Sequence, residues 1–219
     1  MILRRTTSPE DWKEFLAKPD HWKPGRSAME TAYAWERANG LPDAIATFFP
    51  GAEMLFAIPE WKVPLPGGER DSQNDVFALL SDGNGLVPVM VEAKRDEHFG
   101  PTLGEWLKAP SPGKTARLAA ICEMLGLDAA KLDPRLRYQL FHRTASAVVT
   151  AERFHARRAA MVVQSFSPEH RWFGDYAAFA GLFGLSPARD EISETRLPSG
   201  LCLSLGWAHC PLTTENTHQ

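Results

Sequence analysis

The sequence is poor in cysteine and has no long apolar run. Its 219 residues include three cysteines, Cys122, Cys202 and Cys210, and no two of them have the CxxC spacing of a zinc or redox site. We therefore expect a reducing, cytoplasmic environment and no disulfide scaffold. No apolar run approaches the roughly 20 residues that span a bilayer, so we expect no membrane partner. The opening MILRRTTSPEDW reaches arginine after three residues, which does not fit a signal peptide.

The sequence also lacks a strong charge of either sign and the common nucleotide-binding and hydrolase motifs. The formal net charge is −3, so any nucleic-acid-binding surface must be local. No GxGxxG, GxxxxGK or GxSxG is present, which argues against dinucleotide, NTP and α/β-hydrolase chemistry. The stretch PSPGKT at residues 110–115 ends in GKT but lacks the first glycine and the preceding strand. It therefore predicts a helix cap.

What is present is an order of helical and extended segments that fits one domain over residues 1–219. Helices are predicted for residues 8–18, 25–40, 41–51, 111–127, 134–155 and 168–184. Extended segments are predicted for residues 53–65, 74–94 and 158–166 and for a closing hairpin at 194–210, with a Gly/Pro-rich loop at 99–113. The tightly joined early strands should be antiparallel, whereas the helical crossover implies a parallel fourth strand. The expected fold is an α/β mixed sheet flanked by helices.

A hairpin around the turn SDGNG carries charges at its open end. If the chain reverses at this turn, Phe77 lies opposite Met90 and Asp75 lies opposite Glu92. Side chains alternate along a strand, so Lys94 shares a face with Glu92 and Asp75. A bulge at the proline of the second strand would shift this register by one residue.

Two opposed carboxylates repel each other unless a positive charge lies between them. Lys94 and a divalent cation are the two candidates for that charge. Mg²⁺, like other hard cations, takes carboxylate oxygens and completes its shell with water and phosphate oxygens. A lysine beside such a cation can orient a water or neutralise charge on a phosphate, which predicts metal-assisted phosphodiester hydrolysis. The alternative is that Asp75 and Glu92 are solvent-facing strand ends and Lys94 is their surface ion-pair partner.

This arrangement resembles the PD-(D/E)xK nuclease superfamily, which has the restriction-endonuclease-like fold. In that fold an aspartate begins the second strand, (D/E)xK lies on the third, and a helical crossover leads to a fourth. The matching residues here are Asn74–Asp75, Glu92–Ala93–Lys94 and the strand AAMVVQSF. Asn74 stands where the motif has proline, a departure that removes no ligand.

The resemblance covers about residues 26–166 and is closest to uncharacterised bacterial or phage-related branches. It implies catalysis by Asp75, Glu92 and Lys94, with Mg²⁺ or Mn²⁺ as cofactor and DNA as partner. Many members carry a glutamate on the first core helix, which Glu30 matches by position, so the implied metal ligands are Asp75, Glu92 and Glu30. Residues 167–219 match nothing in the family and form a C-terminal extension of a helix and a hairpin.

Two further groups of residues are candidates for contacts to substrate. Gln139, His142 and Arg143 lie on one polar stripe of the long helix at 134–155, where family members often place such side chains near the metal. Gln139 and His142 are second-tier site residues, and Arg143 is a candidate phosphate contact. The alternative for this stripe is a normal solvated face, with His142 as a structural histidine.

The segment HWKPGR at residues 21–26 places Lys23 and Arg26 beside a tryptophan. Such a segment can grip a phosphate backbone or stack a base. Its alternative role is to fix the entry to the helix that follows.

Together these features predict a Mg²⁺-dependent nuclease that acts on DNA. One alternative is a catalytically silent binding module that keeps the fold and works through a partner. Another is a metal-dependent phosphoesterase that acts on RNA or nucleotides. A homodimer is a further possibility, for which LCLSLGW at residues 201–207 would provide an exposed strand edge.

Overall fold

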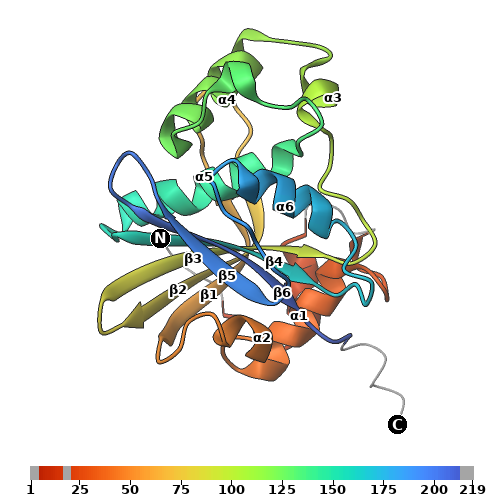
Figure 1. Cartoon of the computed structure of the whole chain (residues 1–219). Coiled ribbons are helices and arrows are strands. Elements are labelled where there is room, and N and C mark those ends of the chain that lie inside the picture. Colours follow the sequence, from red (N-terminus) through yellow and green to blue (C-terminus); the bar gives the residue numbers. More distant parts are fainter. Residues whose placement is uncertain (1–4, 17–20, 213–219) are drawn as a thin grey trace.

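A six-stranded mixed sheet separates two layers of helices in the computed structural model (Figure 1), which describes residues 5–16 and 21–212. The strand order is β1-β2-β3-β4-β6-β5. The strands are β1 (Glu53–Val63), β2 (Ser72–Asp82), β3 (Gly85–Lys94), β4 (Arg158–Ser165), β5 (Glu191–Arg196) and β6 (Cys202–His209). The predicted α/β sheet flanked by helices is confirmed.

The helices divide between the two faces of the sheet. Helices α4 (Pro112–Leu125), α5 (Tyr138–Arg153) and α6 (Phe173–Gly181) lie over one face, and α1 (Ser27–Ala38) and α2 (Asp43–Ala46) lie over the other (Figure 1). The remaining short helices are η1 (Pro9–Glu14), α3 (Leu103–Leu107) and η3 (Ala129–Lys131). Within the described ranges, no helix is both long enough and apolar enough to cross a membrane.

The register of the predicted hairpin is confirmed. Phe77 pairs with Met90 and Leu79 with Pro88, without a shift at the proline. Strands β1, β2 and β3 are antiparallel, and β4 lies parallel to β3 after the helical crossover, as predicted. Because side chains alternate along β2, this strand contributes to the apolar cores on both faces of the sheet. Phe77 packs toward α5, and Val76 packs toward α1.

Local capping explains several element boundaries. Ser111 accepts a hydrogen bond from the Lys114 backbone N–H at 3.2 Å, so PSPGKT is the helix cap that the sequence predicts. Asn39 ends α1 with a φ of 46°. Gly126 ends α4 with a φ of 71°, a conformation that glycine adopts without a Cβ clash.

Three details differ from the sequence predictions. The first helix is the short 3-10 helix η1, and the end of the segment predicted for it falls outside the described residues. The loop predicted for 99–113 contains α3, whose Thr102–Glu105 capping box forms within a Gly/Pro-rich stretch. Finally, β6 lies between β4 and β5, so the stretch 201–207 is not the exposed edge that the homodimer hypothesis needs. Parallel pairing with β4 buries it inside the sheet.

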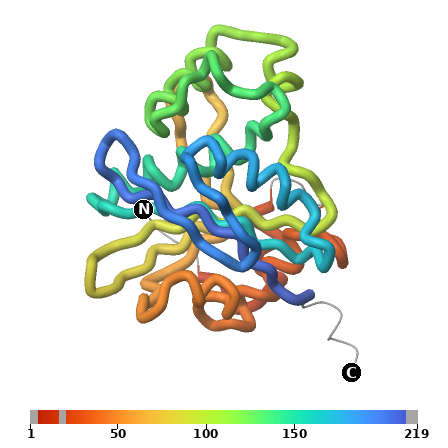
Figure 2. Tube along the Cα trace, viewed as in Figure 1, coloured from red at the N-terminus to blue at the C-terminus, as the bar shows by residue number. Residues whose placement is uncertain are grey.

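The segment between β1 and β2 leaves the sheet and returns to it beside α4 (Figure 2). The guanidinium of Arg117, on α4, donates to backbone carbonyl oxygens of this segment, at 3.1 Å for Leu65 and 2.8 Å for Gly68. The start of β2 is therefore anchored firmly, and this is the end of the strand where the charged residues lie.

Candidate active site

A cavity of about 570 Å³ opens at the charged ends of β2 and β3. Its walls come from β1, β2, β3, α5 and the segment that leads into α1. Of the residues predicted from the sequence, it brings together Lys23, Arg26, Asp75, Glu92, Lys94, Gln139 and Arg143. The two other predicted residues, Glu30 and His142, do not line it.

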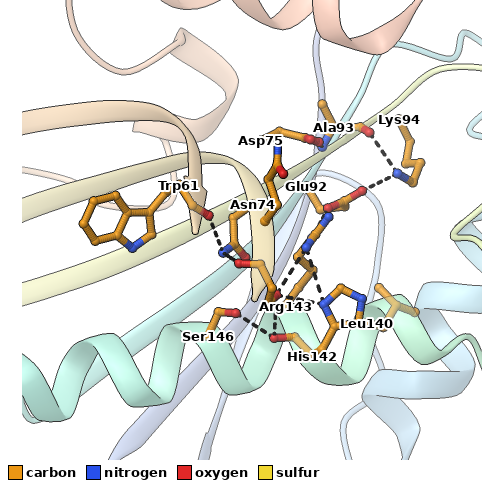
Figure 3. A network of polar contacts seen from close by, with 12 residues as sticks. Trp61, Asn74, Asp75, Glu92, Ala93, Lys94, Leu140, His142, Arg143 and Ser146 are labelled. Carbon is orange, nitrogen blue, oxygen red and sulfur yellow. Dashed lines mark hydrogen bonds and ion pairs between the residues drawn. The ribbon is translucent and has the colours of Figure 1, made fainter. Parts of the chain in front are cut away.

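Glu92 and Lys94 are deeply buried in this cavity wall, with 1% and 5% of their surfaces exposed. The Lys94 ammonium forms an ion pair with Oε1 of Glu92, and Nε of Arg143 forms one with Oε2 (Figure 3). Burial alone would raise the pKa of Glu92, but Arg143 and Lys94 together outweigh it and hold the pKa below its ordinary value. Glu92 is therefore a carboxylate with a cation on each oxygen.

Asp75 lies one residue beyond the last β2–β3 pair, Val76 with Val91, on the strand facing Glu92. Its Oδ2 accepts a hydrogen bond from the Ala93 backbone N–H at 2.6 Å. Burial raises the pKa of Asp75 well above its ordinary value, and the charges of Glu92 and Glu60 raise it further. The crowding of carboxylates that the sequence predicts is thus present.

Sequence reasoning missed Glu60, one of four carboxylates in the cavity. It lies on β1 and accepts a hydrogen bond from the Gln73 side-chain amide at 2.5 Å. Burial raises the pKa of Glu60 to about 7, although Gln73 opposes the shift. The available signal was an acid directly after a proline in the middle of the apolar strand LFAIPEWKV.

Two other acceptor atoms of the cavity wall have no partner in the part of the chain that is described. They are Oε1 of Gln139, on α5, and Oε2 of Glu97, in the loop after β3, and both atoms are buried. Buried polar atoms are normally hydrogen-bonded, and an unpaired one in a cavity wall points to a ligand or water that donates to it. Gln139 thus lines the same cavity as Asp75, Glu92 and Lys94, and its role in a site stays a prediction.

His142 lies behind the site and helps to hold Arg143. Its Nδ1 is 2.8 Å from the Ser72 hydroxyl, which also accepts a hydrogen bond from Arg143 at 3.2 Å. Burial and the neighbouring charge of Arg143 lower the pKa of His142 well below its ordinary value, so the ring is neutral. His142 and Ser72 both border a second cavity, of about 530 Å³.

Glu30 belongs to the opposite face of the sheet. It is fully buried on α1 and pairs with Arg95, whose guanidinium nitrogen is 3.9 Å from its Oε1. Helix α1 packs through Ala34 against Ala93, a residue whose side chain points away from those of Glu92 and Lys94. The structure therefore does not bring Glu30 to the predicted metal ligands.

The oxygen donors in the cavity match the chemistry of a hard divalent cation such as Mg²⁺. The cavity offers the carboxylates of Asp75, Glu92, Glu60 and Glu97, and in the described residues no ion pair joins Asp75 or Glu60 to a cation in the way that Lys94 and Arg143 are joined to Glu92. As the side chains lie, no group of three His, Cys, Asp or Glu residues in the described ranges could hold a metal ion.

The fold and the cavity together define a mixed α/β protein with a buried carboxylate–lysine site. The chain belongs to DUF6946, a domain family of unknown function whose model matches residues 5–211. No curated protein matches the chain, and no solved structure does.

Proposed function

We propose that this protein is a metal-dependent phosphodiester hydrolase with DNA as its substrate. The observation that carries the proposal is the meeting of Asp75, Glu92 and Lys94 in one cavity at the ends of an antiparallel strand pair. A buried carboxylate beside a buried lysine, as Glu92 lies beside Lys94, is costly for a fold, and such groups are concentrated at functional sites.

The order of the strands supports a restriction-endonuclease-like arrangement. Three antiparallel strands carry the acidic pair and the lysine, and α4 and α5 then cross over to β4, which is parallel to β3. This is the order of elements in the PD-(D/E)xK nucleases that the sequence resembles. The sheet continues past this core through β6 and β5.

The roles of the residues follow from their positions. When bound, the cation would activate a water and stabilise charge on the phosphate. Asp75 would be a ligand of the cation, and Glu92 would be a second one. Lys94 is held by Glu92 and by the Ala93 carbonyl oxygen at 3.2 Å, so its ammonium is fixed where it can orient the attacking water or stabilise the phosphate.

The opposite wall of the cavity suits a nucleic-acid backbone. Lys23 and Arg26 come from the segment before α1 and face the same space as the carboxylates, together with His21 and His98. Positive side chains beside an acidic metal site allow a phosphate to enter in spite of the net charge of −3.

A second candidate function is a catalytically silent binding module. The observation that favours it is that both oxygens of Glu92 are already paired with cations, Lys94 and Arg143. If those pairs are permanent, Glu92 binds no metal and the cavity serves recognition alone.

The experiment is a cleavage assay on single-stranded and double-stranded DNA and RNA, with Mg²⁺ or Mn²⁺ and with EDTA. We expect metal-dependent cleavage of DNA that falls by about 10²- to 10⁴-fold in Lys94→Ala, the usual contribution of a positioned proton-transfer group. Lys131→Ala is the matched control, because Lys131 is 84% exposed and pairs only with the nearby Asp128 among the ion pairs observed.

Cleavage of RNA or nucleotides without cleavage of DNA would show that the protein is a phosphoesterase with a substrate other than DNA. Equal cleavage by wild type and Lys94→Ala would contradict the proposal. A folded wild-type protein that binds DNA and cuts none of the substrates would establish the binding module in its place.

A further inference from the structure

We propose that Glu60 is a ligand of the cation in this cavity, in the role that the sequence predicts for Glu30. The inference rests on the proposed metal-dependent function and adds one residue to it. It also extends the cation site from the β2–β3 pair to β1.

The strand register places the three carboxylates in one row. Pro59 pairs with Val76 and Trp61 with Asn74, so Glu60 lies opposite Asp75. Asp75 in turn follows the pair Val76–Val91, so it lies opposite Glu92. All three side chains line the same cavity. A row of acids therefore crosses β1, β2 and β3 at the mouth of the cavity.

The three acids of this row differ in their ion pairs. Glu92 is paired with Lys94 and with Arg143. Glu60 and Asp75 make no ion pair with any residue in the described part of the chain, and they accept hydrogen bonds from the neutral Gln73 amide and the Ala93 backbone N–H, respectively. Within the described residues the direct ion pairs of the row are thus made at Glu92, and a divalent cation would supply a direct positive partner to Glu60 and Asp75.

The backbone at Glu60 is also unusual for a strand. Its φ is 52°, in the left-handed region that residues with a Cβ rarely adopt, and this interrupts the β1–β2 ladder between the pairs made by Pro59 and Trp61. Such outliers gather at functional sites. Here the left-handed turn accompanies a side chain that lines the cavity, although β1 is an edge strand.

The unpaired acceptors of the cavity fit a hydrated cation. Oε1 of Gln139 and Oε2 of Glu97 are buried without a donor in the described residues, and both side chains line the same space as Glu60. Waters on Mg²⁺ are hydrogen-bond donors, and Mg²⁺ keeps several of them in protein sites. These two acceptors are therefore placed to receive hydrogen bonds from the waters of a cation held by Glu60 and Asp75.

Binding of Mn²⁺, measured by electron paramagnetic resonance of the free ion and by calorimetry without nucleic acid, tests the inference. The variants are Glu60→Gln, Glu30→Gln and Glu53→Gln, the last at an exposed position on the same strand. We expect the Kd for Mn²⁺ to rise by about tenfold or more in Glu60→Gln, since even groups that only support a ligand contribute this much. Glu30→Gln and Glu53→Gln should bind as the wild type does, and near-ultraviolet circular dichroism checks that each variant is folded.

Unchanged Mn²⁺ binding in Glu60→Gln would overturn the inference, and so would weaker binding in Glu30→Gln alone or no binding by the wild type. The proposed function fails differently. Tight Mn²⁺ binding that depends on Glu60, without cleavage of any substrate, would support the cation site and contradict the hydrolase. Cleavage together with Mn²⁺ binding that is unchanged in Glu60→Gln would support the hydrolase and contradict the role of Glu60 as a ligand.

Discussion

The polar side chains on the two faces of the sheet differ in the hydrogen bonds and ion pairs that they make. On the α1 face, Gln164 accepts a hydrogen bond from the Trp35 indole at 3.0 Å, and Glu30 is paired with Arg95. On the α5 face, Asp75 and Glu60 crowd together without ion pairs, and Gln139 has an unpaired oxygen, all as far as the described residues go. The pairs named on the α1 face satisfy each other within the protein, whereas the acids and the Gln139 oxygen on the α5 face line a cavity.

This difference shows that residue type alone does not identify a site. Glu30 and Glu60 are both glutamates in contact with the sheet, and only Glu60 faces the cavity. The two glutamates lie on different faces of the sheet, and Glu30 has the Arg95 guanidinium as its ion-pair partner. A carboxylate without a counterion inside a fold is the stronger indication of function.

Removing the cation of each buried pair should have the largest effect on stability. We expect Arg143→Met to lower the free energy of unfolding by about 3 kcal/mol, because Glu92 is left with one cation in a buried wall. Arg95→Met should cost less, because that pair is longer and the Arg95 side chain is 19% exposed. Urea denaturation of both variants measures the difference, and a larger loss in Arg95→Met would reverse the comparison of the two faces.

A smaller effect is expected at two glutamines, one on each face. Gln164→Met leaves the buried Trp35 N–H without its acceptor and should cost about 1–2 kcal/mol. Gln139→Met removes an oxygen that has no partner in the described structure, so the change in stability should stay within about 0.5 kcal/mol. Equal losses of stability in the two variants, measured by the same denaturation experiment, would show that Gln139 contributes as much to the α5 face as Gln164 does to the α1 face.

Much of the fold could be predicted from the sequence because its signals are local. The turn SDGNG fixed the register that pairs Phe77 with Met90, and capping residues marked the ends of α1 and α4. The position of β6 could not be predicted in this way, because the choice of a neighbouring strand depends on contacts between distant parts of the chain. The apolar stretch 201–207 suits an inner strand as well as an edge.

The candidate site was predictable in part for the same reason. Asp75, Glu92 and Lys94 belong to one hairpin, so alternation and register bring them together. Glu60 was missed because its placement depends on a left-handed φ of 52°, and the local signal, an acid after a proline within an apolar strand, does not reveal that φ. Glu30 was misplaced because a helix position alone does not reveal which face of the sheet the helix will cover.

The most direct test of the account is the effect of Mn²⁺ on the thermal stability of the wild type and of Asp75→Asn. The asparagine can keep the hydrogen bond from Ala93 and ends the repulsion within the row of acids. A ligand at 100 times its Kd adds about 2.7 kcal/mol, which corresponds to a rise in Tm of about 5–10 °C for a domain of this size. We predict this rise for the wild type, and for Asp75→Asn a higher Tm without metal and little further gain. No rise in the wild type, or the same rise in both proteins, would contradict a cation site in this cavity.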